Sequence, residues 1–435
     1  MAVCTDEFFA LAKTEAMGWD MPGLPLAVVP HPLAKRNAEE CREFAAGVLG
    51  EIGEALTNDP GLLAAKYRKK TVQAGSRRRY RSLFESEFNA PDAPPTFKGP
   101  DSIEAMNRVF YRRGWTDGLP VLPPTPRRVE AMLEGRQSDL AIGLVEPRLG
   151  RATLGKIAAN AVMAGCEPAH FPVVLAAVRA MIDEGFNLKA LQSTTHPCTV
   201  ACLVGGPVAD ELDVNGAYNV FGQGNRANAA IGRAIRLVLT NIGGASPGAL
   251  DRSTMGSPAK YALCFRENLD ASPWPSYHEE LGLDPADSHV TVFGVEGPHN
   301  VNDHYGRTGE EILLTIAGTL ASPGANNFYL GGQPVVVIGP EHAEVIAADG
   351  FSKMDVKRFL ADRAIVPRAV VSDAMVDAVA DRNPAQLLGE GAADGVRFVT
   401  DPDQLIVLVA GGAGRHSAVL PTFGGSTRAV TRRTE

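Results

Sequence analysis

The chain has 435 residues, more than one ordinary hydrophobic core requires, so two or three domains are expected. Hydrophobic residues make up 45% and charged residues 21%, which are the values of a globular protein and argue against a disordered one. The net charge of −8 argues against a basic face for phosphates. We therefore expect no nucleic-acid partner.

The compartment is predicted from the absence of export signals. No segment approaches the roughly 18–20 apolar residues of a membrane span. The start, Met1–Asp6, carries an acid and no basic region of the kind that opens a secretory signal. The six cysteines lack the spacing of a disulfide framework and are predicted to be reduced thiols. We expect a cytoplasmic protein that does not bind membranes.

The first elements predict a partial α/β domain over residues 1–85. Met1–Thr5 and Leu24–Val29 are predicted strands, and the second one ends at Pro30-His31-Pro32 because proline cannot continue a central ladder. Helices are predicted over Asp6–Ala16 and from about Asn37 to Leu56. The second helix has apolar residues three or four apart, which predicts one buried stripe: Cys41, Phe44, Val48, Ile52 and Leu56. Two strands and two helices make a thin core.

Residues 86–100 are proline-rich and predict a linker. A helix over Ser102–Arg112 and another over Arg127–Leu133 follow, the latter with Thr125 and Pro126 as N-cap and first helical residue. Leu154–Glu184 is a long helical stretch with a break near Gly165–Pro172.

The main body shows an order of elements that occurs twice, about 130 residues apart. The strand Thr199–Val204 ends in Gly205-Gly206-Pro207 and leads to a short helix, a glycine and a long helix. Pro334–Ile338 ends in Gly339-Pro340 and leads to the helices Glu341–Ala348 and Lys353–Ala364 around Gly350; the helix Glu310–Ala321 precedes it. This repeat predicts two related α/β halves, 101–284 and 285–435, that face each other across a cleft.

Two further strands complete the predicted fold, His289–Val295 and Gln404–Ala410. Near-continuous apolar runs such as Leu405–Ala410 indicate strands that are covered on both faces. The predicted fold class is therefore α/β, with helix-covered, mostly parallel sheets in two related halves and a small N-terminal partial domain.

The densest group of reactive side chains directly follows the strand His289–Val295: His299, Asn300, Asn302, Asp303 and His304. Catalytic groups in α/β proteins favour the carboxyl ends of strands. Two imidazoles and a carboxylate supply acid/base chemistry near neutral pH, or His299 and His304 hold a divalent metal. The alternative is a hydrogen-bonded turn, in which Asn and Asp are common.

A glycine-rich turn precedes the predicted helix with the apolar stripe Ile231, Ile235, Val238 and Ile242. Its candidate substrate-binding residues are Gly224, Asn225, Arg226 and Asn228. Backbone N–H groups and the helix dipole at such a position attract an anion, and Arg226 adds a bidentate contact to a carboxylate or phosphate. The turn matches neither a Walker loop nor a full dinucleotide fingerprint, so a structural cap is the alternative.

Two further segments place polar side chains beside strands. His196 and Cys198 precede the strand Thr199–Val204; Cys198 and Cys202 share one face of an extended chain but lie too far apart for a disulfide, so buried structural thiols are expected. Arg415 and His416 follow the turn Gly411-Gly-Ala-Gly414, and we place them at the same cleft rim, with a tight surface turn as the alternative. His342 is a lesser candidate.

Two family resemblances follow from these motifs. Val3-Cys-Thr-Asp-Glu-Phe8 and Ala27-Val-Val-Pro-His-Pro-Leu33 make residues 1–58 resemble the second half of the U-G-S-C family of (seleno)proteins, which is similar to the substrate-activating selenoprotein subunit of glycine and betaine reductases. This resemblance implies a redox Cys or Sec upstream of the matched portion or on a partner chain. Residues 100–435 resemble an uncharacterised bacterial family through Gly114-Trp-Thr-Asp-Gly-Leu-Pro-Val, Gly222-x-Gly-Asn-Arg-Ala-Asn and Gly297-Pro-His-Asn-Val-Asn-Asp-His.

The favoured hypothesis is an enzyme, or an enzyme subunit, that cleaves or reduces a C–S or C–N bond in a small anionic metabolite. Arg226 anchors the anion, Asn300, Asn302 and Arg415 contribute to binding, and His299, Asp303 and His304 act with His196 and His416. One alternative is a metal-dependent hydrolase or lyase without a redox partner. The other is a non-catalytic binding or scaffolding subunit. Because half a domain must be completed by something, an oligomer is expected.

Overall fold

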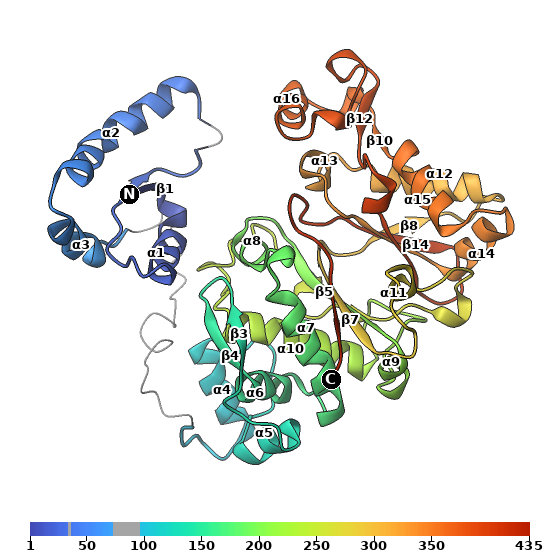
Figure 1. Ribbon diagram of the computed structural model, residues 1–435, viewed down its shortest axis with the longest axis horizontal. Coiled ribbons are helices and arrows are strands. Elements are labelled where there is room, and N and C mark those ends of the chain that lie inside the picture. The colour runs from blue at the N-terminus through green and yellow to red at the C-terminus, as the bar shows by residue number, and fades with distance from the viewer. Residues whose placement is uncertain (34–35, 73–95) are drawn as a thin grey trace.

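The N-terminal unit forms the predicted two-stranded arrangement. A computed structural model describes residues 1–33, 36–72 and 96–435 (Figure 1). Strands β1 (Ala2–Thr5) and β2 (Leu26–Val29) pair in parallel, with α1 (Phe9–Gly18), α2 (Ala38–Thr57) and α3 (Pro60–Lys69) around them. α2 begins after a capping box in which the Asn37 side chain accepts from the backbone and Glu40 returns a bond to the Asn37 N–H. Residues 86–95 of the predicted linker lie outside the described residues.

The predicted burial of α2 is wrong. Within α2, all of whose residues the structure describes, no side chain is buried, and Leu56 is 73% exposed. The apolar residues do lie three or four apart along α2, but the two short strands and the other helices of the unit do not bury them. The N-terminal unit touches the body through ion pairs of Glu7 with Arg252 and of Glu15 with Lys189.

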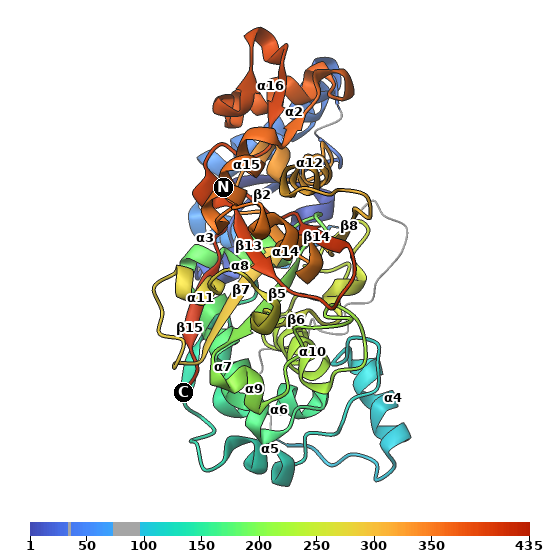
Figure 2. The ribbon, with the colours of Figure 1, turned by 90° about the vertical axis from the view of Figure 1, so that its right-hand side faces the viewer.

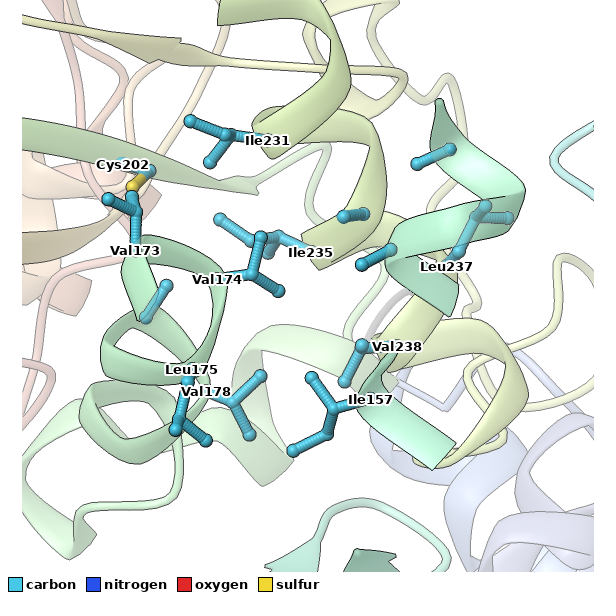
Figure 3. Packing of buried hydrophobic residues seen from close by; sticks show 14 of the residues in the cluster. Ile157, Val173, Val174, Leu175, Val178, Cys202, Ile231, Ile235, Leu237 and Val238 are labelled. Atoms are coloured by element: carbon cyan, nitrogen blue, oxygen red, sulfur yellow. The ribbon is translucent and has the colours of Figure 1, made fainter. Parts of the chain in front are cut away.

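The body begins with helices that cover one side of the first sheet. Figure 3 shows their packing around Ile157, Val174 and Ile235. The helices are α4 (Ile103–Arg113), α5 (Pro126–Leu133), α6 (Leu154–Ala164), α7 (Phe171–Met181), α8 (Leu188–Ser193), α9 (Pro207–Glu211) and α10 (Arg226–Asn241). Between α5 and α6 the chain forms a small antiparallel hairpin of β3 (Ala141–Val145) and β4 (Gly150–Thr153).

Two four-stranded sheets lie at the centre of the body. The first has the order β15-β7-β5-β6, and the second has the order β13-β9-β14-β8. Their strands are β5 (Thr199–Gly205), β6 (Cys264–Phe265), β7 (His289–Val295), β8 (His299–Asn302), β9 (Val335–Ile338), β13 (Ile406–Val409), β14 (His416–Leu420) and β15 (Val430–Arg433).

A second set of helices covers the far side of the second sheet. These are α12 (Gly309–Leu320), α13 (Asn327–Leu330), α14 (Pro340–Ala348) and α15 (Lys353–Arg363), with α11 (Tyr277–Glu280) between β6 and β7. A peripheral lobe adds α16 (Asp373–Arg382) and a small antiparallel sheet of β10 (Ile365–Val366), β11 (Leu387–Leu388) and β12 (Gly395–Arg397).

Strand alternation stacks these elements in four layers: helices, sheet, sheet, helices. On β5, Val200, Cys202 and Val204 face the first helix layer, whereas Ala201 and Leu203 belong to a core between the sheets. On β9, Val336 and Ile338 face the second helix layer, and Val335 and Val337 enter the same intersheet core. Figure 2 shows α12 and α15 above the sheets and α6, α7 and α10 below them.

The prediction of an α/β protein is confirmed, but the prediction of mostly parallel sheets is wrong. Three strand pairings in the described chain are parallel and seven are antiparallel. The apolar strands are indeed covered on both faces, but a helix layer covers one face and the other sheet covers the second. β7 and β15, from the predicted second half, pair with the first sheet; the domain limits stay a prediction.

Most predicted elements are confirmed within a few residues, including the break between α6 and α7 at Gly165. Strand β8 was predicted as a turn, and β14 and β15 were not predicted. None of the described helices is both long and apolar enough to span a membrane.

The intersheet core predicts which substitutions destabilise the body. Leu203 is 1% exposed between the sheets, so Leu203→Ala should lower the free energy of unfolding by about 2–5 kcal/mol. Leu144→Ala, on the exposed side of β3 at 53% exposure, is the matched control and should change it by less than about 0.5 kcal/mol. Urea unfolding of the full chain measures both. Equal effects at the two positions would contradict this assignment of the core.

Candidate functional site

The structure places two imidazoles in direct contact at the edge of the second sheet. The Nε2 atoms of His304 and His416 are 3.3 Å apart, and their rings meet edge to face at 80°. His416 opens β14, and His304 follows β8, the neighbouring edge strand. Both side chains are exposed. The candidate site is therefore open to solvent at the rim of the intersheet layer.

Asn300 orients one member of this pair. His416 pairs with Asn302 in register, and Asn300 lies one step along β8 on the same face, where its Oδ1 is 2.9 Å from His416 Nδ1. With the amide oxygen as acceptor, Nδ1 of His416 carries the proton and Nε2 keeps its lone pair. We define the His304–His416 pair with Asn300 as the imidazole pair site.

Asp303 holds the turn that carries His304. Its carboxylate accepts the N–H groups of Tyr305 and Gly306 at 3.1 and 2.7 Å and the Thr315 hydroxyl at 2.7 Å. Burial would raise the pKa of this carboxyl, but the three hydrogen bonds together outweigh it and hold the pKa below its usual range. The carboxylate is thus engaged in the turn, and this geometry agrees with the structural alternative for Asp303.

His342 supports the same turn from inside. It is fully buried, with Nε2 3.0 Å from the Asp303 carbonyl oxygen and Nδ1 2.8 Å from the Ser417 hydroxyl. Arg415 donates to the carbonyl of Gly306 at 2.5 Å. The imidazole pair site therefore rests on a turn that is fixed by side chains of α12, α14 and β14.

Other predicted residues lie elsewhere. His299 is exposed and, by strand alternation, on the opposite face of β8 from Asn300. Arg226 pairs with Glu167 at 2.5 Å, with both side chains more than half exposed. The Asn228 side chain hydrogen-bonds the backbone of Asn215.

The loop that precedes the glycine-rich turn contacts the segment that leads to His416. Gly411 donates to the carbonyl of Gly216, and the Tyr218 ring lies against Gly412, where a Cβ atom would come within 2.1 Å of it. Gly224 has φ +114°, a left-handed value that favours glycine. Asn225 occupies the N-cap position of α10, and its Oδ1 is buried with no hydrogen-bond partner in the described part of the chain.

His196 forms a separate pair with Glu296, a residue that the sequence analysis did not select. His196 Nε2 is 2.8 Å from Glu296 Oε1, the His196 side chain is 10% exposed, and its Nδ1 has no hydrogen-bond partner among the residues that the structure describes. The backbone N–H of Glu296 bonds to Pro421, beyond the end of β14, whereas His416 opens that strand. The four steps from His416 to Leu420 span roughly 13 Å, so the two centres lie at opposite ends of β14.

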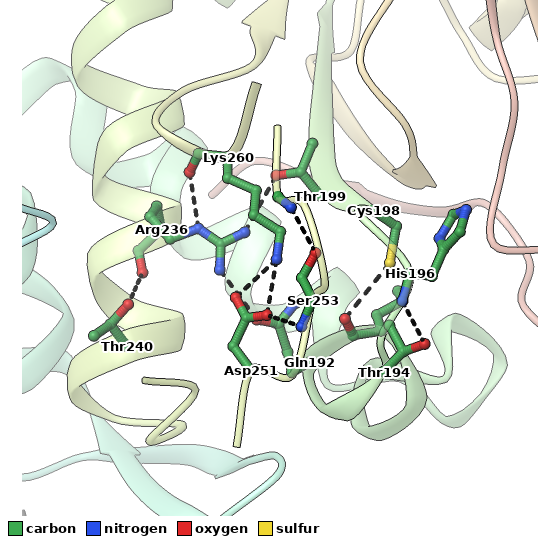
Figure 4. A network of polar contacts seen from close by, with 12 residues as sticks. Gln192, Thr194, His196, Cys198, Thr199, Arg236, Thr240, Asp251, Ser253 and Lys260 are labelled. Carbon is green, nitrogen blue, oxygen red and sulfur yellow. Dashed lines mark hydrogen bonds and ion pairs between the residues drawn. The ribbon is translucent and has the colours of Figure 1, made fainter. Parts of the chain in front are cut away.

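A buried polar network lies beside His196 (Figure 4). The Arg236 guanidinium on α10 is buried and donates to the Lys260 carbonyl at 2.9 Å, while Lys260 Nζ pairs with Asp251 at 2.7 Å. Burial lowers the pKa of Arg236. The His196 ring points away from this network. Arg236 lies next to the apolar stripe of α10, and the sequence analysis did not select it.

The comparisons with known proteins concern mainly the N-terminal unit. Residues 1–58 match the UGSC family, which confirms the resemblance of this segment. No curated protein matches the chain. The resemblance of residues 100–435 to an uncharacterised bacterial family stays a prediction.

The buried His342 predicts how stability depends on pH. Burial lowers the pKa of His342 below its ordinary value of about 6.5, so between these two values the unfolded chain binds more protons than the folded one. The stabilisation is therefore complete above pH 6.5 and decreases as the pH falls below it. His342→Gln, which does not titrate, should flatten the decline of the unfolding free energy between pH 7 and pH 5. An unchanged slope in urea titrations would refute this assignment.

Proposed function

We propose that this chain is an enzyme that cleaves a C–S or C–N bond in a small anionic metabolite, with the imidazole pair site as its reaction centre. The observation that carries the proposal is the contact between His304 and His416, with His416 oriented by Asn300. An imidazole lone pair accepts a proton and an imidazole N–H donates one, so two rings in contact offer both a base and an acid.

An elimination reaction uses both the proton acceptor and the proton donor of the pair. One Nε2 lone pair takes the proton from the carbon next to the C–S or C–N bond, and the electron pair of that C–H bond forms a carbon–carbon double bond. The electrons of the C–S or C–N bond leave with the sulfur or nitrogen, which receives a proton from the other imidazole. Atoms and charge balance without any reductant.

The cysteines favour elimination over reduction by a thiol of this chain. All six are free, and Cys166, Cys198, Cys202 and Cys264 are buried. Burial raises the pKa of Cys166 and of Cys198 to about 12, and a hydrogen bond with Cys202 together with burial raises that of Cys264. Redox thiols need the opposite environment, namely an exposed and stabilised thiolate. A reductive reaction would need the redox Cys or Sec of a partner chain.

Arg415 is the better placed of the two arginines to receive the substrate anion. It precedes His416 directly and reaches the turn after His304, whereas Arg226 is engaged with Glu167. We retain Arg226, Gly224 and Asn225 as a second anion contact, supported by the loop that links their turn to Gly411.

The wider organisation is also proposed. Two related halves are supported by the repeated strand, Gly-Pro and helix order, and by one parallel and two antiparallel pairings in each sheet. Trp19, Leu49 and Leu56, exposed by 62–75%, support a partner chain or a second copy on the N-terminal unit. Six free cysteines support a cytoplasmic protein.

Single-residue variants test the reaction centre. His304→Ala and His416→Ala should each lower kcat/KM by about 10²–10⁴-fold, because proton transfer at the pair is lost. His299→Ala, on the other face of the same strand, should stay within about threefold of the parent. The assay is thiol or ammonia release from small carboxylates that carry a thioether or amino group next to an acidic C–H bond. Full turnover in both variants would make the pair structural.

Thiol blocking tests the absence of a redox role. Treating the folded chain with iodoacetamide should leave turnover within about twofold, because four thiols are buried and the other two, Cys4 and Cys41, lie on the N-terminal unit. Mass spectrometry of the alkylated chain identifies the cysteines that react. Loss of turnover in step with alkylation of one cysteine would replace elimination by thiol chemistry.

A further inference from the structure

The gap between His304 and His416 has the dimension of a metal site. In a tetrahedral zinc site with Zn–N bonds of about 2.0–2.1 Å, two ligand nitrogens lie about 3.3–3.4 Å apart. The two Nε2 atoms are 3.3 Å apart in this structure. A cation can therefore bind both nitrogens with little movement of either ring. We propose that the imidazole pair site binds a divalent transition-metal ion.

The outer contacts of the pair match those of metal-binding histidines. Such residues usually donate their second ring N–H to a carboxylate, a carbonyl oxygen or water, which fixes the tautomer with a lone pair towards the metal. His416 has this contact, because its Nδ1 lies 2.9 Å from Asn300 Oδ1. His304 is fixed through its backbone, on the turn that Asp303 and His342 hold.

The pair leaves the other coordination positions open. Within residues 1–33, 36–72 and 96–435, no group of three or more His, Cys, Asp or Glu side chains is placed to hold a metal, so the protein supplies two nitrogens. Imidazole ligands suit Zn²⁺, Co²⁺, Ni²⁺ and Cu²⁺ better than Mg²⁺ or Ca²⁺. Water or a small anion fills the open positions, and Arg415 beside His416 adds positive charge for an anion.

The cation and the shared proton occupy the same gap. A metal bound by both lone pairs leaves neither Nε2 free to carry a proton. Metal binding therefore inhibits the elimination. This consequence rests on the proposed function, whereas the binding itself does not. We expect Zn²⁺ to block turnover reversibly and a chelator to restore it.

Equilibrium dialysis of the full chain against Co²⁺ tests the binding, and the absorption bands of bound Co²⁺ report a tetrahedral site. His304→Ala and His416→Ala should each weaken or abolish one site, by tenfold or more. Asn300→Ala should weaken the same site by about 10–100-fold, as removal of an outer partner does. His299→Ala is the control and should bind as the parent does.

Two results would overturn the inference. One is Co²⁺ binding that is unchanged in both His304→Ala and His416→Ala, and the other is an equal loss in His299→Ala. Melting temperatures of the variants establish that each is folded. Turnover is measured separately: full activity in the two variants sinks the proposed elimination, and activity that rises with Co²⁺ supports the site but replaces the acid/base mechanism by a metal-dependent one.

Discussion

The structure of the body depends on one constraint, which is that both faces of each central sheet must be covered. Helices cover the outer faces, and the intersheet core formed by residues such as Leu203, Phe293 and Val337 covers the inner ones. The intersheet core does not extend over the edge of the second sheet at β8. Among the described strands, β8 pairs only with β14, so none of them covers its second edge. Polar side chains at such an edge keep their hydrogen-bonding groups in contact with water. Asn300 and Asn302 are exposed for that reason, on the face that would otherwise continue the core. The imidazole pair site is therefore located where the two sheets stop covering each other.

Much of the fold could be predicted because apolar periodicity reports burial directly. The strand His289–Val295 is observed with the same limits, and the break at Gly165 separates α6 from α7. An apolar run shows that a strand is buried, but it does not show whether a helix or a second sheet covers each face. A strand between a helix layer and a second sheet has the same apolar run as one between two helix layers, so the parallel sheets were wrongly predicted. The same limit explains α2, whose stripe is apolar but uncovered.

The candidate site could be predicted only in part, because its contacts join distant segments. A dense polar run drew attention to His304 and Asn300, but the side chain that contacts His304 is 112 residues away at His416, and His299 points to the other face. Asp303 and His342 looked like acid/base candidates by residue type. Their hydrogen bonds tie both of them to the turn that carries His304, and their predicted roles stay predictions. Glu296 gave no signal of its own, because a single carboxylate after a strand gains meaning only from His196 opposite it.

The two ends of β14 have different neighbours, and this bears on how the UGSC-matching segment takes part. That segment contacts the body through α8, where Lys189 pairs with Glu15, and through Arg252, which pairs with Glu7. α8 leads directly into His196, and the segment after Arg252 is tied back to it, since Thr254 donates to the carbonyl of Thr195. The N-terminal unit is thus connected to the His196–Glu296 end of the strand, and the imidazole pair lies at the opposite end. The contacts of residues 1–58 with the body are therefore separated, along β14, from the pair at which we propose the reaction.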